Sequence, residues 1–404
     1  MAALELVDRI VCSMDVKKLS LGIFLDLSKA FDTLDHSIIL DKLKHYGIKD
    51  TALELLKSYL NGREQIVQYN DTLSSKLVIQ TGVPQGSILG PLLFIIYLND
   101  FKNVCNIFKP IIYADDTALF TVLETSIISN QNPSLIINKE LELISKWFKL
   151  NKLSLNSEKT KAMLFHSINK NIPDIDVEIG GRKIEYVNEF KYLGIILDKN
   201  LSWKPHLSHI SKKVARTNNV LCRLKNILPC NIMKTIYNSI ILPHLTYGII
   251  VWGSVAERLF KLQKRSIRLI SNSKYNSHTE PLFKSFSLLK IKDLFLLHQY
   301  NFIFKLENNM LPSYFNSSVF IRNNQYHNYN TRNANDYRTV LSRHAFTDNS
   351  IRFRLPRVYI SIPQCIKEKI HTHSRQGFNK YAKCIILNRY NTECSIENCH
   401  ICQN

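Results

Sequence analysis

The stretch IIYADDTALF, residues 111–120, places two adjacent carboxylates inside an otherwise apolar run of β-forming residues. The apolar residues on both sides predict two strands, with 114–117 as the turn of a β-hairpin. Carboxylates beside buried strands cost several kcal/mol unless positive charge lies against them. This chain must therefore supply or bind a cation that neutralises Asp115 and Asp116.

A third carboxylate completes the pattern. In FLDLSKAFD, residues 24–32, Asp26 stands between two leucines on a predicted strand of its own, 21–27. If this strand pairs beside the hairpin, Asp26 and Asp115 converge on one edge of the sheet. Mg²⁺ prefers oxygen ligands, and two such ions roughly 4 Å apart stabilise the attacking and leaving oxygens of phosphoryl transfer. Each motif alone is weak, because Asp-Asp pairs are common and a strand aspartate more often bonds to a nearby loop.

Charge divides the chain near residue 200. Residues 1–200 hold 23 Lys and Arg against 24 Asp and Glu, whereas residues 201–404 hold 30 against 9, so the net charge of +20 lies in the second half. An uneven distribution of this kind favours a polyanionic partner, most simply nucleic acid. Nine scattered cysteines and the lack of an apolar leader predict an intracellular protein, of nucleus or cytoplasm, without a membrane partner.

Periodicity supports the same division. Before residue 200 the patterns predict mixed helices and strands: helices over 3–18, 35–47, 51–62 and 135–151, and hairpins over 63–81 and 177–198. From Trp203 onward the pattern becomes helical, with an apolar stripe at a three-and-four spacing: Ile210, Val214, Thr217, Leu221, Leu224 and Leu228. Basic residues lie off this stripe and on one face of a second helix: Lys212, Lys213, Arg216 and Arg223, then Arg258, Lys261, Arg265 and Arg268. Solvated helix faces and contacts with a nucleic-acid backbone explain these two basic helices about equally well.

The order of the motifs is more specific than any one of them. FLDLSKAFD is followed by TGVPQGSILGPLLF (81–94), YADD, LSLNSEKTKAMLF (153–165) and FKYLGIILD (190–198). In this order the sequence resembles the reverse transcriptases, most closely those of non-LTR retrotransposons of the LINE type, jockey- or CR1-like. The resemblance extends from about residue 4 to about residue 305, and YNTR (329–332) resembles the same elements more loosely.

The resemblance implies roles for the acidic residues. Asp26 and Asp115 would ligate two Mg²⁺ ions, for which Mn²⁺ can substitute, with the backbone carbonyl of Leu27 assisting. Asp116 would complete the acidic site as electrostatic support. Lys159 matches the lysine that protonates or neutralises the pyrophosphate leaving group; otherwise it is an exposed surface lysine.

Substrate-binding roles follow from the same resemblance. Phe31 matches the aromatic residue that excludes a ribose 2′-OH, and its alternative is a plain core aromatic. Gln85 and Gly86 would let the template–nucleotide pair approach the backbone closely. Tyr192, Leu193 and Gly194 match the hairpin that positions the primer 3′-OH.

The implied fold is the α/β palm of a right-hand polymerase, a small antiparallel sheet with helices, followed by an all-α basic thumb and a C-terminal helical region. The expected limits are 1–200 for the palm with a remnant of the fingers, 201–290 for the thumb and 291–404 for the C-terminal region. Only 25 residues precede Asp26. The fingers are therefore expected to be mostly missing, as in an element truncated at its N-terminus, which puts nucleotide binding in doubt.

The end of the chain, CSIENCHIC, supplies Cys394, Cys399, His400 and Cys402, which are residue types that zinc favours. Cys399 and His400 are adjacent, however, and leave little room to fold round one ion. A cysteine-rich tail without zinc is the simpler interpretation.

Three functions remain open from the sequence. The first is RNA-directed DNA polymerase, with an RNA template, a DNA primer or RNA–DNA hybrid, and deoxynucleotides. The second is a catalytically inactive nucleic-acid-binding remnant of such an element. The third, an RNA-templated RNA polymerase, is disfavoured by Phe31 and by YADD in place of GDD.

Overall fold

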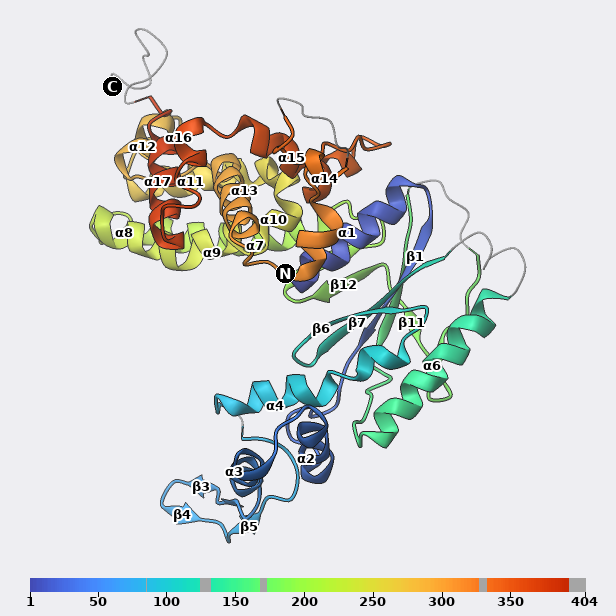
Figure 1. Cartoon of the computed structure of the whole chain (residues 1–404). Helices are drawn as coiled ribbons and strands as arrows, with labels where there is room; N and C mark the ends of the chain where they lie inside the picture. Colours follow the sequence, from blue (N-terminus) through green and yellow to red (C-terminus); the bar gives the residue numbers. More distant parts are fainter. Residues whose placement is uncertain (85, 124–131, 168–172, 327–332, 392–404) are drawn as a thin grey trace. The chain divides into compact units, whose positions relative to one another are not determined.

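The computed structural model describes residues 1–84, 86–123, 132–167, 173–326 and 333–391 (Figure 1). These residues form two compact units. The sheet unit consists of Lys17–Leu193, and the helical unit consists of Ala3–Val16 together with Gly194–Asn404. The chain passes from the first to the second inside a single hairpin, seven residues before the predicted boundary at 201.

The sheet unit is built on five strands in the order β11-β8-β1-β7-β6. Its strands and helices are β1 (Leu19–Leu25), α2 (His36–His45), α3 (Asp50–Leu60), β2 (Glu64–Gln65), β3 (Gln68–Tyr69), β4 (Thr72–Leu73), β5 (Leu77–Val78), α4 (Leu89–Leu98), β6 (Lys109–Tyr113), β7 (Asp116–Leu123), α6 (Pro133–Leu150), β8 (Lys161–Phe165), β9 (Glu178–Ile179), β10 (Arg182–Lys183), β11 (Glu185–Tyr186) and β12 (Glu189–Tyr192). All pairings of the large sheet are antiparallel except that of β11 with β8.

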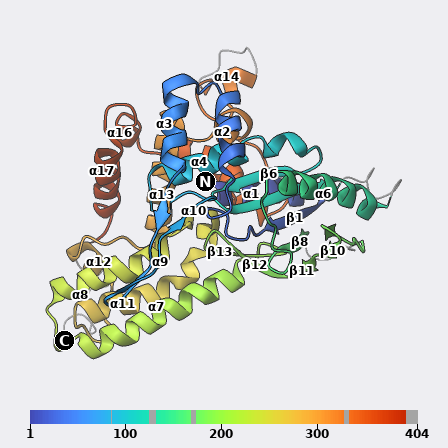
Figure 2. The same cartoon turned by 90° about the horizontal axis from the view of Figure 1, so that it is seen from below.

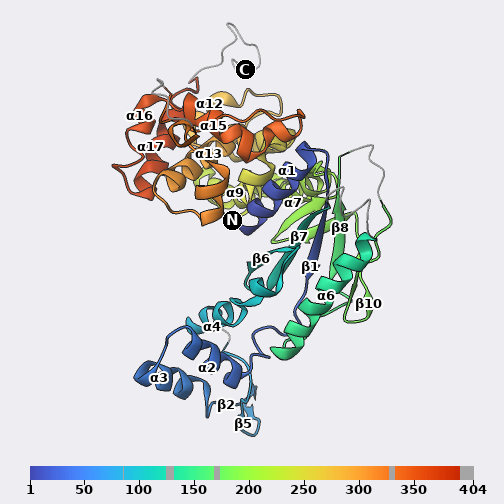
Figure 3. The ribbon, with the colours of Figure 1, turned by 45° about the vertical axis from the view of Figure 1, so that its right-hand side comes forward.

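Strand β1 is central, and every one of its residues is buried. Its alternate residues Leu19, Leu21, Ile23 and Leu25 enter one apolar core, which also takes Ile137, Leu141, Ile144 and Phe148 of α6. On the opposite face Phe24 stacks on Phe190 with ring centroids 4.2 Å apart. Helix α6 lies along one face of the sheet in Figures 1 and 3. Because both faces are covered, a shift of β1 by one residue would exchange its two sets of side chains and is strongly disfavoured.

The helical unit holds strand β13 (Ile195–Asp198) and the remaining helices. They are α1 (Ala2–Asp15), α7 (Lys204–Leu224), α8 (Cys230–Ile236), α9 (Leu242–Thr246), α10 (Ile249–Trp252), α11 (Phe260–Ile270), α12 (Glu280–Ser285), α13 (Ile291–Glu307), α14 (Asn323–Tyr326), α15 (Ile351–Ser361), α16 (Gln364–Lys367) and α17 (Arg375–Leu387). Helices α7 and α11 run side by side (Figure 2). Between them Asn218 donates to the carbonyl of Leu262 (3.1 Å) and accepts from Ser266 (2.7 Å).

The apolar stripe predicted for α7 is confirmed at Ile210, Val214 and Leu221, which are buried. The next buried position is Asn218 rather than the expected Thr217, because its amide bonds to α11. Lys212 and the other basic residues predicted off the stripe are exposed or half-buried, as are those of the second basic helix.

Helix α1 groups with the helical unit although it begins the chain. Arg352 of α15 donates to Asp8 through Nε (3.2 Å) and Nη2 (2.7 Å), and the Asp8 side chain is completely buried. Asp15, near the end of the helix, accepts from the backbone N–H of Arg343 at 2.8 Å and from the hydroxyl of Thr347 at 2.6 Å. These contacts join segments more than 300 residues apart in sequence.

No single helix among the described residues is long and apolar enough to cross a membrane. One pair, Cys230–Thr246 and Ile249–Ile270, meets the length and composition test jointly, with a bend of 49° between its members.

Candidate active site

Asp26 directly follows β1, one residue beyond the end of the strand, so its predicted place within a strand is wrong. The chain leaves the ladder here because the backbone of Asp26 bonds to the 153–160 segment instead. Its N–H donates to the hydroxyl of Thr160 (3.4 Å), and its carbonyl accepts from the N–H of Asn156 (2.9 Å). Leu27 forms a bridge with Leu155. Two of the predicted motifs are thereby held together at the aspartate.

The turn of the YADD hairpin is shorter than predicted. Tyr113 pairs with Asp116, so the turn contains only Ala114 and Asp115, and Asp116 begins β7. Two-residue turns are the commonest hairpin connections, since they match the twist of the strands. Ala114 takes a φ of 51°, a left-handed conformation that costs a non-glycine residue of order 1 kcal/mol.

The three carboxylates lie near one another at the end of the sheet. Leu25 pairs with Thr117, and continuing this register by one residue sets Asp26 opposite Asp116. Burial, with the charges of Asp115 and Asp26, raises the pKa of the Asp116 carboxyl. Among the described residues, no side chain forms a hydrogen bond or an ion pair with any of these three carboxylates. The site therefore carries negative charge that the described chain does not compensate.

This chemistry fits a divalent cation, because partnerless carboxylate oxygens are the ligands that Mg²⁺ takes. The ligand geometry is not assembled, however. In the ranges given above, no three His, Cys, Asp or Glu side chains already lie in an arrangement that would hold a metal ion. The structure thus supports a charged acidic cluster, and the two-metal arrangement stays a prediction.

Phe31 lies on a loop that the glycine-containing segment fixes. Its ring is half-buried and packs on Phe94 of α4 with centroids 4.7 Å apart. The Phe31 carbonyl accepts from the N–H of Val83 (2.9 Å), and the Leu34 carbonyl accepts from Gly82 (2.7 Å). A half-buried ring satisfies both interpretations of Phe31, since one face packs and the remainder is open.

Gly82 is a structural requirement that the sequence interpretation overlooked. Its φ is +87°, and a Cβ at this position would lie 2.7 Å from the backbone oxygen of Asp32. The signal was present in TGVPQG, where a glycine precedes the Val-Pro pair. Gly86 also has a positive φ, +83°, but a Cβ there would meet no protein atom within 4 Å. Gln85 lies outside the described residues.

Lys159 lies in the segment that binds the backbone of Asp26. Its N–H donates to the side-chain oxygen of Asn156 (3.2 Å), the residue whose own N–H reaches the Asp26 carbonyl. The Lys159 side chain is exposed, and it forms no ion pair with the described residues. The structure places this lysine in the segment next to the acidic cluster without giving its ammonium a structural partner.

Tyr192, Leu193 and Gly194 form the end of one strand and the turn of the β12–β13 hairpin. Leu193 and Gly194 both have positive φ, 46° and 79°, as a tight hairpin turn demands. The buried ring of Tyr192 lies 5.4 Å from that of Phe24 in β1. The predicted hairpin is confirmed, and its role with a primer stays a prediction.

The C-terminal residues Cys394, Cys399, His400 and Cys402 lie outside the described residues, as does YNTR.

Comparison with solved structures finds telomerase of Candida tropicalis in complex with a fragment of telomeric RNA, at 11% sequence identity and a TM-score of 0.37. The match covers 73% of this chain and 50% of that one. Telomerase of Candida albicans gives a TM-score of 0.36 at 13% identity, covering 75% of this chain and 46% of that one.

Sequence comparison is more informative. The chain is 30% identical over 297 residues to the RNA-directed DNA polymerase from the mobile element jockey of Drosophila melanogaster, covering 70% of this chain and 31% of that protein. It is 28% identical over 328 residues to the probable RNA-directed DNA polymerase from transposon X-element of Drosophila melanogaster. This match covers 78% of this chain and 35% of that protein. The chain spans about a third of the length of these relatives.

The family model described as reverse transcriptase (RNA-dependent DNA polymerase) matches residues 4–197. This range contains the acidic cluster, the glycine-containing segment and the 153–160 segment. Residues 4–197 therefore belong to the reverse transcriptase family and are a reverse transcriptase domain of the kind found in non-LTR retrotransposons.

Proposed function

We propose that this chain is an RNA-directed DNA polymerase that joins deoxynucleotides to the 3′-OH of a primer on an RNA template. The observation that carries the proposal is the acidic cluster: Asp26, Asp115 and Asp116 meet at the end of the central strands without a positive partner among the described residues. Such a cluster is unfavourable for stability and is explained by binding of cations.

In this proposal Asp26 and Asp115 hold two divalent ions, Mg²⁺ or Mn²⁺, with the carbonyl of Leu27 as a further ligand. Held there, such ions would supply the positive charge that favours ionisation of the primer hydroxyl and offsets the charge on the transferred phosphate. Asp116 keeps the site negative, so that the ions stay bound. The exposed ammonium of Lys159 donates to the departing pyrophosphate.

The remaining candidates would position the substrates. Phe31 excludes the ribose 2′-OH, which makes deoxynucleotides the substrate. Gln85 and Gly86 contact the template–nucleotide pair, and the open space over Gly86 is consistent with a close approach. The Tyr192–Gly194 turn orients the primer end, an effect worth several kcal/mol of the barrier.

In this proposal the helical unit supplies both the thumb and the C-terminal region. The sheet unit would be the palm. The helices from residue 201 to 290, which include the exposed basic residues of α7 and α11, would follow the phosphate backbone of the RNA–DNA hybrid. Residues 291–404 would form the C-terminal region, and the polymerase would act in the nucleus or cytoplasm.

Primer extension tests the proposal. The purified chain is given an RNA template, a DNA primer, deoxynucleotides and Mg²⁺, and is compared with the isosteric variant Asp115→Asn/Asp116→Asn. A matched control, Asp71→Asn/Glu142→Gln, removes two exposed carboxylates elsewhere in the sheet unit. We expect extension by the wild type and the control, and a loss of at least about a hundredfold in the acidic-site variant.

A second function, nucleic-acid binding without polymerisation, is favoured by the unassembled metal geometry and by the basic second half of the chain. Salt-sensitive binding of the same hybrid with no extension by the wild type would support this alternative and contradict the polymerase.

A further inference from the structure

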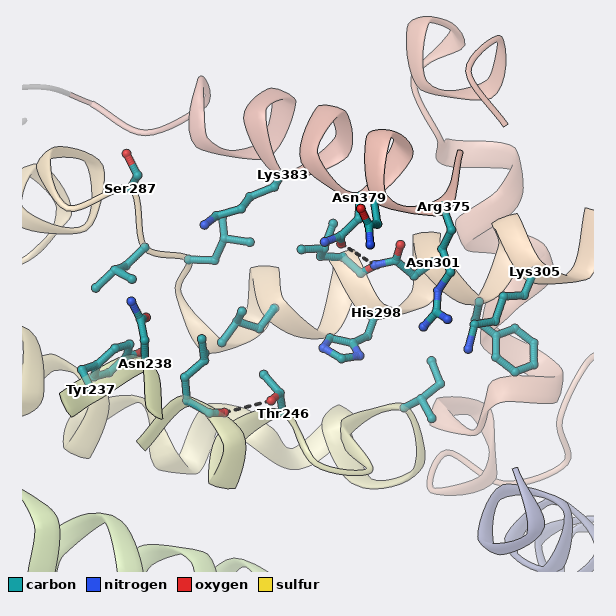
Figure 4. A pocket seen from close by; sticks show the side chains of 18 of the residues that line it. Tyr237, Asn238, Thr246, Ser287, His298, Asn301, Lys305, Arg375, Asn379 and Lys383 are labelled. Carbon is teal, nitrogen blue, oxygen red and sulfur yellow. Dashed lines mark hydrogen bonds between the residues drawn. The ribbon is translucent and has the colours of Figure 1, made fainter. Parts of the chain in front are cut away.

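The helical unit contains a cavity of about 990 Å³ (Figure 4), and its lining includes no residue of α7 and none of the acidic cluster. Helix α17 forms one wall, α13 a second, and the segment from α8 to α9 a third. In Figure 4, Lys383 and Arg375 of α17, with His298 and Lys305 of α13, are drawn around the opening between these walls.

The charge of this cavity has one sign. Its lining includes Lys234, Lys305, Arg375 and Lys383, and no lining residue carries a carboxylate. None of the four forms an ion pair with any described residue. Lys234, Lys305 and Lys383 are nevertheless half-buried, so their charges are partly removed from water. Positive groups gathered without an anion destabilise the fold, and a bound anion would remove that cost.

The four cations form two pairs. Burial and the charge of Arg375 lower the pKa of Lys305, and burial and the charge of Lys234 lower the pKa of Lys383. Arg375 and Lys383 lie eight residues apart on α17, so their backbone positions are about 12 Å apart along the helix axis. A ligand with two separated negative groups fits this spacing better than a single phosphate does.

Amide groups line the space between the pairs. Asn301 donates to the side-chain oxygen of Asn379 at 2.7 Å and to the carbonyl of Leu297 at 3.0 Å. Its own side-chain oxygen is buried and accepts no hydrogen bond from the described residues. A phosphodiester group carries no proton and offers no donor, whereas a nucleotide strand also carries base amino groups and, in RNA, 2′-hydroxyls.

We propose that the cavity between α8–α9, α13 and α17 binds the phosphate backbone of a single-stranded nucleic-acid segment, with one phosphate at each pair of cations. This site is additional to the basic faces of α7 and α11, and it would bind a strand whether or not the acidic cluster catalyses polymerisation. It gives the C-terminal helices a function of their own in holding the nucleic acid.

Fluorescence anisotropy of a short labelled oligouridylate with the full-length chain tests the proposal. EDTA is present and deoxynucleotides are omitted, so polymerase activity does not affect the result. The cavity variants are Lys305→Gln/Arg375→Gln and Lys234→Gln/Lys383→Gln. The matched control is Lys292→Gln/Lys380→Gln, which removes two exposed cations from the same helices α13 and α17 outside the cavity lining.

We expect each cavity variant to bind the RNA about tenfold more weakly near physiological salt. The dependence of log K on log salt should lose about 0.7 from its slope, because each variant removes the contact with one phosphate. The control should bind within about twofold of wild type. Since the substitutions relieve repulsion between like charges, the Tm of the cavity variants should not fall, which separates a binding defect from a folding defect.

Two results would overturn the proposal. The first is that cavity variants and control bind the oligouridylate equally. The second result would identify a free polyphosphate as the ligand. Tripolyphosphate would raise the Tm of the wild type but not that of the cavity variants, while the cavity substitutions would leave RNA affinity unchanged. In that case the ligand is a free polyphosphate rather than a strand.

Discussion

Leu25 of β1 pairs with Thr117 of β7, and this register sets Asp26 opposite Asp116. Since these carboxylates repel each other, we expect Asp116→Asn to raise the free energy of unfolding in EDTA, by up to about 1 kcal/mol. Mn²⁺ should then raise the Tm of the wild type more than that of the variant. Calorimetry with and without Mn²⁺ measures both effects, with Asp71→Asn as the control. An identical Mn²⁺ response in all three proteins would contradict a metal site.

Gly82 provides a test of the loop that carries Phe31. Gly82→Ala combines a φ of +87° with a contact of 2.7 Å to the Asp32 backbone, whereas Gly62→Ala has a φ of +69° with open space around the new methyl group. We expect Gly62→Ala to cost about 1 kcal/mol of unfolding free energy and Gly82→Ala at least about 2 kcal/mol more. Urea denaturation measures the difference, and equal costs would show that the loop adjusts.

Gly86→Ala separates stability from function. A Cβ at Gly86 meets nothing within 4 Å, and the φ of +83° resembles that of Gly62, so both variants should lose similar stability. If Gly86 faces the template–nucleotide pair, only its variant should lose primer extension. We expect a rate at least about tenfold lower than that of Gly62→Ala, which corresponds to about 1.4 kcal/mol of activation free energy. Equal extension rates for the two variants would remove Gly86 from the binding site.

Phe31→Val distinguishes a selective residue from a packing residue. The ring packs on Phe94, so the substitution should cost about 1–2 kcal/mol of stability in either case. The informative quantity is the ratio of kcat/KM for a deoxynucleotide to kcat/KM for the ribonucleotide, which should fall at least about tenfold. Phe260→Val is the control, because Phe260 is also half-buried and stacks on a phenylalanine, Phe283. An unchanged ratio identifies Phe31 as a core residue.

Arg352 tests the attachment of helix α1. Arg352→Met leaves the fully buried Asp8 with the hydroxyl of Tyr314 as its one side-chain donor among the described residues, so we expect a loss of about 3–5 kcal/mol. Arg357→Met breaks the more exposed pair with Asp348 and should cost less than about 1 kcal/mol. Chemical denaturation of both variants gives the comparison. Similar small losses would mean that α1 is held by its apolar face alone.

His206 makes the helical unit sensitive to acid. Burial, and then the charge of His209, lowers the pKa of His206 to about 4. The unfolded chain takes up this proton near pH 6.5 and the folded chain only near pH 4. The free energy of unfolding therefore falls as the pH decreases between these values, by about 2–3 kcal/mol.

Urea denaturation of His206→Asn at pH 7 and pH 4.5 measures this contribution. Asparagine keeps an acceptor for the N–H of Ile196, which bonds to Nδ1 of His206 at 3.3 Å. The variant should show the smaller loss between the two pH values, while His45→Asn, which alters an exposed histidine, should behave as wild type. If all three proteins lose the same stability, His206 is not the responsible group.

Local patterns were sufficient for much of the fold. Alternating and three-to-four residue spacings depend on neighbours in sequence, so the two strands of the YADD hairpin and the apolar stripe of helix α7 were predicted from local pattern. The hairpin at Leu193 and Gly194 was implied by the family resemblance. The errors also have local causes. Asp26 looks like a strand residue between two leucines, but its backbone bonds to Asn156 and Thr160, 130 and more residues away.

The amino-acid sequence by itself determined the family, because the order of five motifs does not depend on how the chain packs. It also determined the asymmetry of charge. Only the tertiary structure decided which distant residues meet: Asp26 with Asp116 through the register of β1 and β7, Asp8 with Arg352 across 344 positions, and the four cations of the cavity from α8, α13 and α17. These contacts come from the packing of elements that are separate in the sequence, and no local periodicity records such packing.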